Sequence, residues 1–207
     1  MSIEINDILL PYFLFCLLGG YLIGSLPFGL ILTKLAGLGD LREIGSGNIG
    51  ATNVLRTGNK GLALATLLLD GGKGALSVFL AHLVFGEIDL LYFAGAGAFL
   101  GHLYPVFLKF KGGKGVATFL GTLLALNWPL GAICCLTWFF TAVIFRISSL
   151  SALLAAVMGP LYSYLIFNNS ALAIFTGLLC IMIFISHRDN IKRLLSGTEP
   201  KIGKKST

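Results

Sequence analysis

The sequence predicts an all-α, polytopic integral membrane protein, and three observations support this fold class. Hydrophobic residues make up 56% of the 207 residues, and charged residues make up only 12%, about half the share found in an average soluble domain. The apolar residues form long runs that match the length of a bilayer crossing. The Lys and Arg residues lie almost entirely between these runs. We expect one integral domain over residues 1–207, with no separate soluble module.

Seven apolar runs are the predicted membrane helices. The fourth is shorter than the roughly 20 residues that a crossing helix needs. It pairs with the fifth run across a break at 127–129, so the two either cross as a hairpin or only dip into the membrane. We therefore expect seven transmembrane helices, or five plus a re-entrant hairpin at 115–145. The runs are 8–32, 62–85, 88–108, 116–126, 129–145, 147–167 and 171–186.

The first and third runs carry a packing signal. The pairs Gly20-x3-Gly24 and Gly97-x3-Gly101 have the small-residue spacing that lets two membrane helices approach closely. Pro27 is expected to kink the first helix, which membrane helices tolerate.

The second run contains two charges, Asp70 and Lys73, with two glycines between them. Opposite charges inside an apolar run are costly unless they pair and face inward, so they indicate either a structural ion pair or a functional site. If the helix breaks at Gly71-Gly72, we expect Lys73 to face a cavity open to the cytoplasm, where it is a candidate phosphate-binding residue.

The cations fix the predicted orientation. If the fourth and fifth runs return the chain to the side that it left, all fifteen Lys and Arg residues can be placed on, or facing, one side. The other side receives Glu4, Asp7, Glu87, Asp89 and no cation. By the positive-inside rule the N-terminus is outside and the C-terminus is cytoplasmic.

The first polar cluster, residues 45–56, is called the Ser46 loop. Its glycines let the backbone curl so that amides face one concavity suited to anions. Hydroxyl and amide side chains add neutral donors, and Arg56 adds a planar fork for phosphate or carboxylate. The alternative is a flexible interhelical linker. The candidate substrate-binding residues are Gly45, Gly47, Asn48, Thr52 and Asn53, beside Ser46 and Arg56.

The second cluster is residues 109–118, and its glycine-rich part, residues 111–115, is called the Lys114 loop. A glycine-rich turn at a helix start presents free amides and the positive end of the helix dipole. It is not a Walker A loop, because Gly115 follows Lys114 where Ser or Thr would be required. The alternative is an ordinary positive-inside loop. The candidate phosphate-binding residues are Lys111, Gly112, Gly113, Lys114 and Gly115.

A third cluster at 186–193 contains His187 and Asn190. His187 is either a base, a phosphate ligand or a polar anchor at the membrane surface. Several classes of chemistry lack a signal. The four cysteines lie in apolar runs without a C-x-x-C pair, no His/Asp/Glu group has metal-ligand spacing, and we expect no metal and no cofactor. The basic residues form no soluble basic face, so no nucleic-acid partner is expected.

Across its whole length the chain resembles the bacterial acyl-phosphate-dependent glycerol-3-phosphate acyltransferases (the PlsY family). The resemblance rests on five motifs: G-S-G-N-x-G-x-T-N-x-x-R at 45–56, D-x-x-K-G at 70–74, G-H-x-x-P at 101–105, K-G-G-K-G-V-A-T at 111–118 and H-R-x-N at 187–190. It implies that Ser46 and Arg56 are essential and that the Lys114 loop holds a phosphate. It also implies that His187 and Asn190 support binding or catalysis, and that Glu199 matches a structural glutamate.

The resemblance further implies a multi-pass protein of the bacterial inner membrane whose active site faces the cytoplasm. Its substrates would be acyl phosphate and glycerol 3-phosphate, beside membrane lipid and a soluble enzyme that makes acyl phosphate. The chemistry of the residues agrees, because acyl phosphate is activated and needs no enzyme nucleophile. Holding two dianions together would explain the clustered cations. A phosphate or organophosphate transporter is the alternative function, and a non-catalytic lipid-binding protein is a third.

Overall fold

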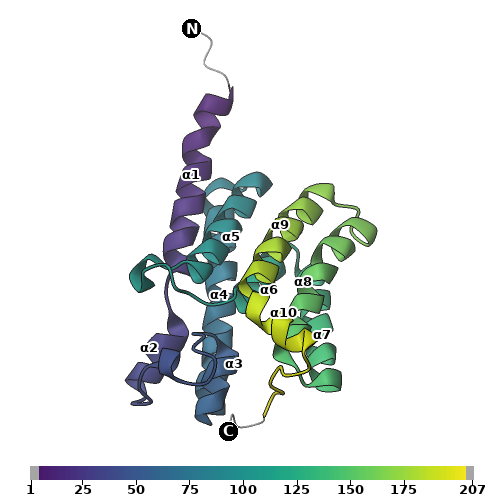
Figure 1. The fold of residues 1–207 in the computed structure, drawn as a ribbon. Coiled ribbons are helices and arrows are strands. Elements are labelled where there is room, and N and C mark those ends of the chain that lie inside the picture. The colour runs from purple at the N-terminus through teal and green to yellow at the C-terminus, as the bar shows by residue number, and fades with distance from the viewer. Residues whose placement is uncertain (1–4, 204–207) are drawn as a thin grey trace.

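Long apolar helices form the described part of the chain, residues 5–203 of a computed structural model (Figure 1). The α-helices are α1 (Ile5–Gly24), α2 (Phe28–Leu35), α3 (Ala51–Val54), α4 (Lys60–Phe85), α5 (Ile88–Leu103), α6 (Val116–Leu126), α7 (Trp128–Phe145), α8 (Ser148–Leu165), α9 (Ser170–Ser186) and α10 (Arg188–Leu195). Short 3-10 helices η1 (Leu41–Glu43), η2 (Leu55–Thr57) and η3 (Val106–Leu108) lie in the connections. The all-α prediction is confirmed. Glu4, Lys204 and Lys205 lie outside the described residues.

The predicted small-residue pairs hold α1 against α5. A Cβ on Gly20 or Gly24 would overlap the backbone of α5, and one on Gly97 or Gly101 would overlap the backbone of α1. The two helices therefore touch main chain to main chain, the packing that such spacings allow in lipid. The bend predicted at Pro27 is also present, since α1 ends at Gly24 and α2 begins at Phe28.

One expectation about the second run is wrong. Helix α4 passes through Gly71-Gly72 without a break, and the Lys73 side chain is only 2% exposed. Lys73 therefore does not face an open cavity. The α-helical hydrogen bonds can continue through both glycines because neighbouring helices hold this stretch: Gly71 lies against the backbone of α6, and Gly74 packs on Thr118.

The short helix α6 lies beside α4 and reaches the end of the bundle opposite the Ser46 loop. Near its start, Thr118 donates a hydrogen bond to the carbonyl oxygen of Asp70, 2.9 Å away. Near its end, Leu126 shares a cavity with Gly86 in the α4–α5 turn. The Asn127 side chain then caps α7 by accepting from Leu130 N at 3.0 Å. The chain returns along α7 to the end from which α6 came.

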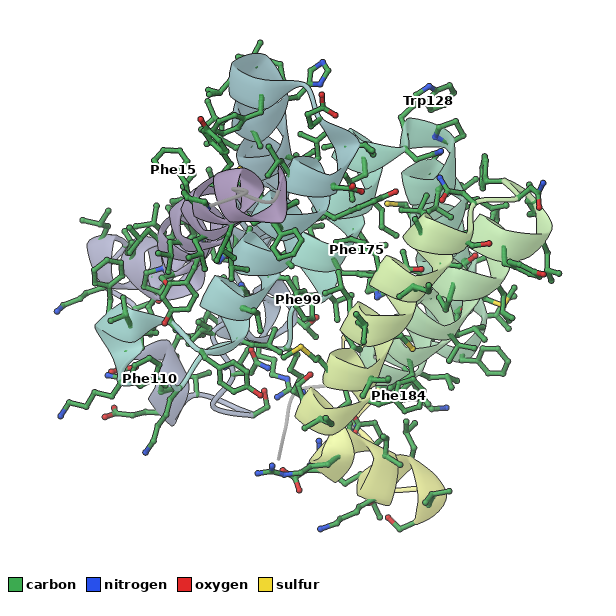
Figure 2. All side chains as sticks on the ribbon, turned by 90° about the horizontal axis from the view of Figure 1, so that it is seen from above. Phe15, Phe99, Phe110, Trp128, Phe175 and Phe184 are labelled. Atoms are coloured by element: carbon green, nitrogen blue, oxygen red, sulfur yellow. The ribbon has the colours of Figure 1, made fainter. Side chains whose placement is uncertain are left out.

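Aromatic side chains divide the bundle into a buried interior and an apolar outside (Figure 2). Phe99, Phe119 and Phe175 are buried between α5, α6 and α9. Phe15 and Trp128 point outward and are 66% and 72% exposed. Large apolar side chains on an outer surface are compatible with a lipid solvent rather than water.

By length and composition, five of the described helices can cross a membrane, counting α1 and α2 as one broken span. Helices α9 and α10 form a sixth candidate, which bends by 67° at their junction. Helix α6 is apolar but short. The protein is thus an all-α, multi-pass integral membrane protein.

Candidate active site

Four chain segments that are far apart in sequence meet at one end of the bundle, the lower end in Figure 1. The Ser46 loop reaches α8, where the Thr52 and Ser148 hydroxyls lie 3.1 Å apart. The Lys114 loop reaches α10, where the Lys114 ammonium donates to Asn190 Oδ1. The C-terminal segment returns to α8, where Ser149 donates to Glu199 Oε1 at 2.7 Å. The three polar clusters of the sequence are therefore one site.

Asn53 holds the Ser46 loop from inside. Its amide group donates to the carbonyl oxygens of Leu41 and Ile44 at 3.0 and 2.9 Å. Its Oδ1 accepts from the Ser46 backbone at 3.1 Å, and the side chain is 2% exposed. Both the oxygen and the nitrogen of this amide are thus hydrogen-bonded to backbone groups of the protein itself. The geometry favours a structural role for Asn53 over the predicted contact with substrate.

The remaining candidates of this loop lie at its surface. Ser46 and Thr52 are exposed, and Arg56 is half-buried with its guanidinium near Asn53 Oδ1, 3.5 Å away. Gly45 has φ +55°, and a Cβ there would lie 2.7 Å from Arg56 Cδ. Gly47 also has a positive φ, of +69°. Asn48 turns the backbone by accepting from Gly50 N at 2.9 Å. These contacts fix the backbone of the loop that carries the exposed Ser46 and the half-buried Arg56.

The Lys114 loop lies across the end of α5. Gly112 N donates to Leu103 O at 3.1 Å, and Gly113 N donates to His102 O at 3.0 Å. These two amides are already bonded, so they are not among the free amides predicted at this turn. The free donors lie further on, in the first turn of α6, because the first amides of a helix have no partner within it. Gly115 begins this helix with φ +82°. Lys111 is exposed at the rim.

A chain of hydrogen bonds fixes the Lys114 ammonium. Asn190 accepts from Lys114 with its oxygen and donates to Glu199 Oε1 with its nitrogen, at 2.5 Å. Glu199 Oε2 also accepts from Arg193 Nε at 2.6 Å. Burial of Glu199 alone would raise its pKa. Hydrogen bonds from Asn190, Ser149 and Arg193 outweigh burial and hold that pKa below its ordinary value. Glu199 is therefore an anion that orients Asn190.

The charges around Lys114 are of both signs: Glu199 and Asp189 are negative, and Arg193 and Arg56 are positive. The pKa of Lys114 is lowered to about 8, mainly by burial; Arg193 and Arg56 also lower it, whereas Glu199 and Asp189 oppose them. Arg56 therefore acts electrostatically on Lys114, although the two side chains come from different loops. Lys114, Arg56 and Arg193 together exceed Glu199 and Asp189 by one positive charge, and this positive field favours a negatively charged ligand.

His187 lies buried at the junction of α9 and α10. Its Nδ1 is 2.8 Å from Ile183 O, so Nδ1 carries the proton and Nε2 keeps a lone pair in the neutral ring. Burial and the nearby Lys114 ammonium lower the pKa of His187 to about 4. The imidazole is thus neutral near pH 7 and is a weak base.

No three His, Cys, Asp or Glu side chains in the described residues gather as a metal site would require. The donors at the site are instead amides, hydroxyls and cations. This set suits phosphate oxygens.

Comparison with known proteins identifies the family. The family described as "Glycerol-3-phosphate acyltransferase" matches residues 14–197, which is most of the chain. The chain belongs to this family. It is a membrane acyltransferase of phospholipid synthesis.

Individual relatives agree over nearly full length. A glycerol-3-phosphate acyltransferase of Cereibacter sphaeroides is 60% identical over 188 residues, covering 91% of this chain and 89% of its own. One of Rhodopseudomonas palustris is 57% identical over 197 residues, covering 95% and 99%. The crystal structure of PlsY (YgiH), an integral membrane glycerol 3-phosphate acyltransferase, in its glycerol 3-phosphate form is 38% identical. It covers 92% of this chain and 96% of its own, with a TM-score of 0.86. The crystal structure of its lysophosphatidic acid form shows 37% sequence identity to this chain, with a TM-score of 0.84.

Sequence reasoning missed part of the site. Ser148 and Ser149 were not singled out, because two serines at the start of an apolar run give no signal until α8 is seen to begin at the site. Glu199 was matched only loosely by resemblance, yet it accepts three side-chain hydrogen bonds there. A lone glutamate in a polar tail has no pattern that predicts its partners.

Proposed function

We propose that this enzyme takes its acyl group from acyl phosphate and transfers it to the 1-hydroxyl of sn-glycerol 3-phosphate. The products are 1-acyl-glycerol 3-phosphate, which is lysophosphatidic acid, and inorganic phosphate. The supporting observation is that Arg56 and Lys114, from two separate loops, lie close enough for the Arg56 charge to lower the pKa of Lys114, and that Ser46, in the same loop as Arg56, is exposed. The solved relatives, whose forms are described by glycerol 3-phosphate and lysophosphatidic acid, support the same pair of ligands.

The cations reduce the electrostatic repulsion between the two substrates, which is the main physical obstacle to this reaction. Both substrates carry phosphate groups, which repel each other when they approach within reacting distance. Arg56 and Lys114 offset this repulsion, and the free amides at the start of α6 add a helix N-terminus for one phosphate. We assign the binding of phosphate oxygens to Lys111, Lys114 and Gly115, with Asn48 and Thr52 at the rim. Gly112, Gly113, Gly45, Gly47 and Asn53 shape the two loops.

The transfer step needs no covalent enzyme intermediate. The 1-hydroxyl oxygen of glycerol 3-phosphate attacks the acyl carbonyl carbon, and the carbon–oxygen bond to the phosphate then breaks. The hydroxyl proton passes to an oxygen of the departing phosphate. His187 is a poor alternative base, because a pKa of about 4 lies far below the working pH. We assign to His187 and Asn190 the positioning of Lys114 and of the substrate.

We assign to the Ser46 hydroxyl a hydrogen bond to the carbonyl oxygen of the acyl phosphate. Its side chain is exposed at the rim, and its backbone is fixed by Asn53 Oδ1 at 3.1 Å. A hydroxyl held in this way can donate to the negative oxygen that develops in the transition state. Removing one such donor costs about 100- to 1,000-fold in kcat in other enzymes.

The test uses purified protein with palmitoyl phosphate and glycerol 3-phosphate, and follows both phosphate and lysophosphatidic acid. We expect product with palmitoyl phosphate and none with palmitoyl-CoA. Equal activity with both donors would contradict the proposal. Ser46→Ala and Arg56→Ala should lower kcat/KM by roughly 100-fold or more.

The matched controls are an exposed serine at the opposite end and an exposed arginine outside the pocket. Ser170→Ala and Arg42→Ala should keep the activity of the unaltered protein, since Arg42 makes only a surface ion pair with Asp40. Full activity in Ser46→Ala would show that Ser46 takes no part in catalysis.

The orientation is part of the proposal. We place the N-terminus outside, the C-terminus and the active site in the cytoplasm, and the protein in the bacterial inner membrane with seven passes. The position of α6 supports seven, because its end shares a cavity with the α4–α5 turn. A soluble enzyme that makes acyl phosphate stays a predicted partner. The transporter alternative has no support from a family of acyltransferases.

A further inference from the structure

Three ionisable side chains lie buried behind the Lys114 loop, in the region where α4, α5 and α6 meet. They are Asp70 and Lys73 on α4 and His102 on α5, and each side chain is at most 4% exposed. The Asp70 carboxylate is 2.9 Å from Lys73 Nζ and 3.6 Å from His102 Nδ1. Charges inside a membrane bundle are costly and usually serve a function. The reaction as described above does not use them.

His102 is in direct contact with the Lys114 loop. Its carbonyl oxygen accepts from Gly113 N at 3.0 Å. Its imidazole lies against the other face of Gly113, and a Cβ on that glycine would overlap the ring. His102 therefore fixes the loop one residue before Lys114, through both its main chain and its side chain.

The Asp70 backbone contacts the start of α6, three residues beyond the Lys114 loop. Its carbonyl oxygen accepts from the Thr118 hydroxyl at 2.9 Å, in the first turn of α6. Lys73, the partner of its carboxylate, also donates to Leu26 O at 3.0 Å, where the break between α1 and α2 leaves carbonyls without a helical partner. His102 thus holds the Lys114 loop against α5, the Asp70 backbone holds the start of α6 against α4, and Lys73 connects α4 to the α1–α2 break.

We propose that Asp70, Lys73 and His102 are positioning residues for acyl transfer, which hold the Lys114 loop in the geometry that binds a phosphate-bearing substrate. The proposal rests on the function proposed above for that loop. An apolar cluster of the same size would give the folded protein equal or greater stability, because a buried ion pair rarely stabilises a protein more than well-packed hydrophobic residues of similar volume do. The charged groups instead hold their partners in one orientation. Such precision matters, because a misplacement of reacting groups by about 1 Å can lower activity 100-fold.

The first test separates positioning from plain stability. His102→Gln removes the ring but keeps the backbone contact with Gly113, and Asp70→Asn removes the charge at nearly constant shape. We expect each to raise KM for glycerol 3-phosphate or for palmitoyl phosphate roughly tenfold, with a smaller fall in kcat. Thr118→Val is the mild variant, which removes only the bond to Asp70 O. It should fold normally and raise the same KM by a smaller factor.

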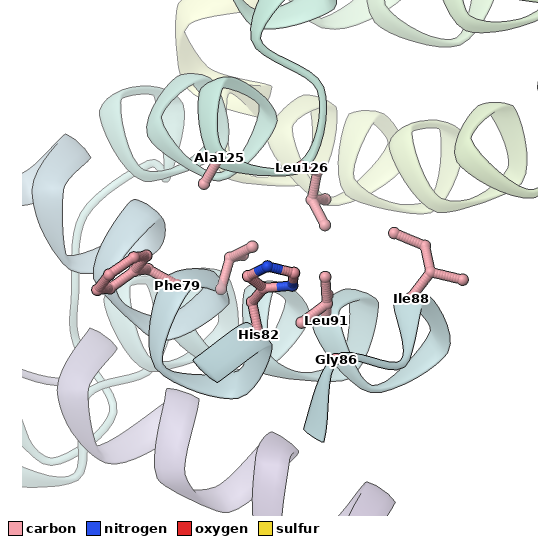
Figure 3. A pocket seen from close by; sticks show the side chains of 8 residues that line it. Phe79, His82, Gly86, Ile88, Leu91, Ala125 and Leu126 are labelled. Carbon is pink, nitrogen blue, oxygen red and sulfur yellow. The ribbon is translucent and has the colours of Figure 1, made fainter. Parts of the chain in front are cut away.

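The matched control is His82, an exposed histidine at the far end of α4. His82 projects into a cavity of about 370 Å³ lined by Phe79, Ile88 and Leu126 (Figure 3). His82→Gln should leave both KM values unchanged. If His102→Gln, Asp70→Asn and Thr118→Val change only the melting temperature or kcat, with both KM values unaltered, the inference is wrong. If the unaltered protein makes no product, the proposed function fails instead.

A double-mutant cycle tests the ring contact itself. In Gly113→Ala the new methyl meets the His102 imidazole, whereas in Gly112→Ala it meets backbone oxygens of α5. His102→Ala should therefore relieve the KM defect of Gly113→Ala and leave that of Gly112→Ala unrelieved. Equal defects of Gly113→Ala with and without the ring would contradict positioning through His102.

Discussion

At the scale of single residues, the site depends on one ammonium group held in an unfavourable place. Lys114 is partly buried and has Arg193 and Arg56 as positive neighbours. Burial is the larger effect, and together these influences lower its pKa to about 8. The same arrangement that weakens the hold of Lys114 on its proton leaves its charge poorly screened by water. That charge is therefore available to a phosphate ligand.

This pKa predicts opposite responses of activity and stability to alkaline pH. Below pH 8 the folded protein keeps Lys114 charged, and above it the charge is lost. We expect kcat/KM to fall above about pH 8. Lys114→Arg should remove this fall, because a guanidinium keeps its proton there. An unchanged alkaline fall in the arginine variant would contradict the assignment.

Stability should move the other way. Between pH 8 and the ordinary lysine pKa of 10.5, the unfolded chain keeps a proton on Lys114 that the folded protein has released. The unfolded state therefore binds more protons in this window, and the contribution of Lys114 to the free energy of unfolding rises with pH. The melting temperature of the unaltered protein should exceed that of Lys114→Arg by more at pH 9.5 than at pH 7.5.

Residue roles were predictable from sequence only where residue type sets the chemistry. Arg56 and Lys114 are cations beside glycines, and that pattern alone indicates an anion site. Asn53 lies in the same pattern but is buried, and no sequence feature separates its amide from that of the half-buried Asn48. Glu199 depends on a return of the tail to α8, a long-range contact that a local pattern does not encode.

At the scale of helices, the α1–α5 contact offers a sharp comparison between neighbouring glycines. A methyl group on Gly20 would overlap the backbone of Ala94, whereas one on Gly19 meets nothing within 4 Å. Gly20→Ala should lower the free energy of unfolding by about 1–3 kcal/mol, the usual cost of overpacking. Gly19→Ala should leave it unchanged or raise it slightly, since Ala favours helix. Thermal unfolding in detergent measures both, and equal melting temperatures would contradict the close contact.

Helix positions were largely predictable because apolar runs and small-residue spacings are local signals. The break at Pro27 follows from the missing amide of proline. The unbroken α4 does not follow from local rules, since Gly71-Gly72 weakens a helix in isolation. Contacts with α6 at Gly71 and Gly74 hold it, and Asp70 and Lys73 then pair inside the helix instead of opening a cavity. Tertiary packing overrode propensity here.

At the scale of the whole molecule, chain topology and chemistry use the same end of the bundle. The segments that the predicted crossings place on one side of the membrane are in contact there. One example is the hydrogen bond that Ile202 N donates to Arg146 O at 2.7 Å. The positive-inside rule and a site for two anionic substrates both require cations at one end. Under the proposed orientation and function, a single charge distribution would both orient the chain and bind the substrates. Acyl phosphate, an anion with an apolar chain, would meet this pocket at the membrane surface.

The last prediction tests this coupling by labelling single cysteines in intact cells. Asn168 and Ser196 are exposed at opposite ends of the bundle, whereas the four native cysteines are buried or half-buried in apolar helices. A membrane-impermeant thiol reagent should label Asn168→Cys in intact cells and Ser196→Cys only after permeabilisation, with the unaltered chain as the background control. Labelling of Ser196→Cys from outside would place the active site on the outer face. The cations would then lie on the side that the positive-inside rule disfavours, and their presence would have to be explained by substrate binding alone.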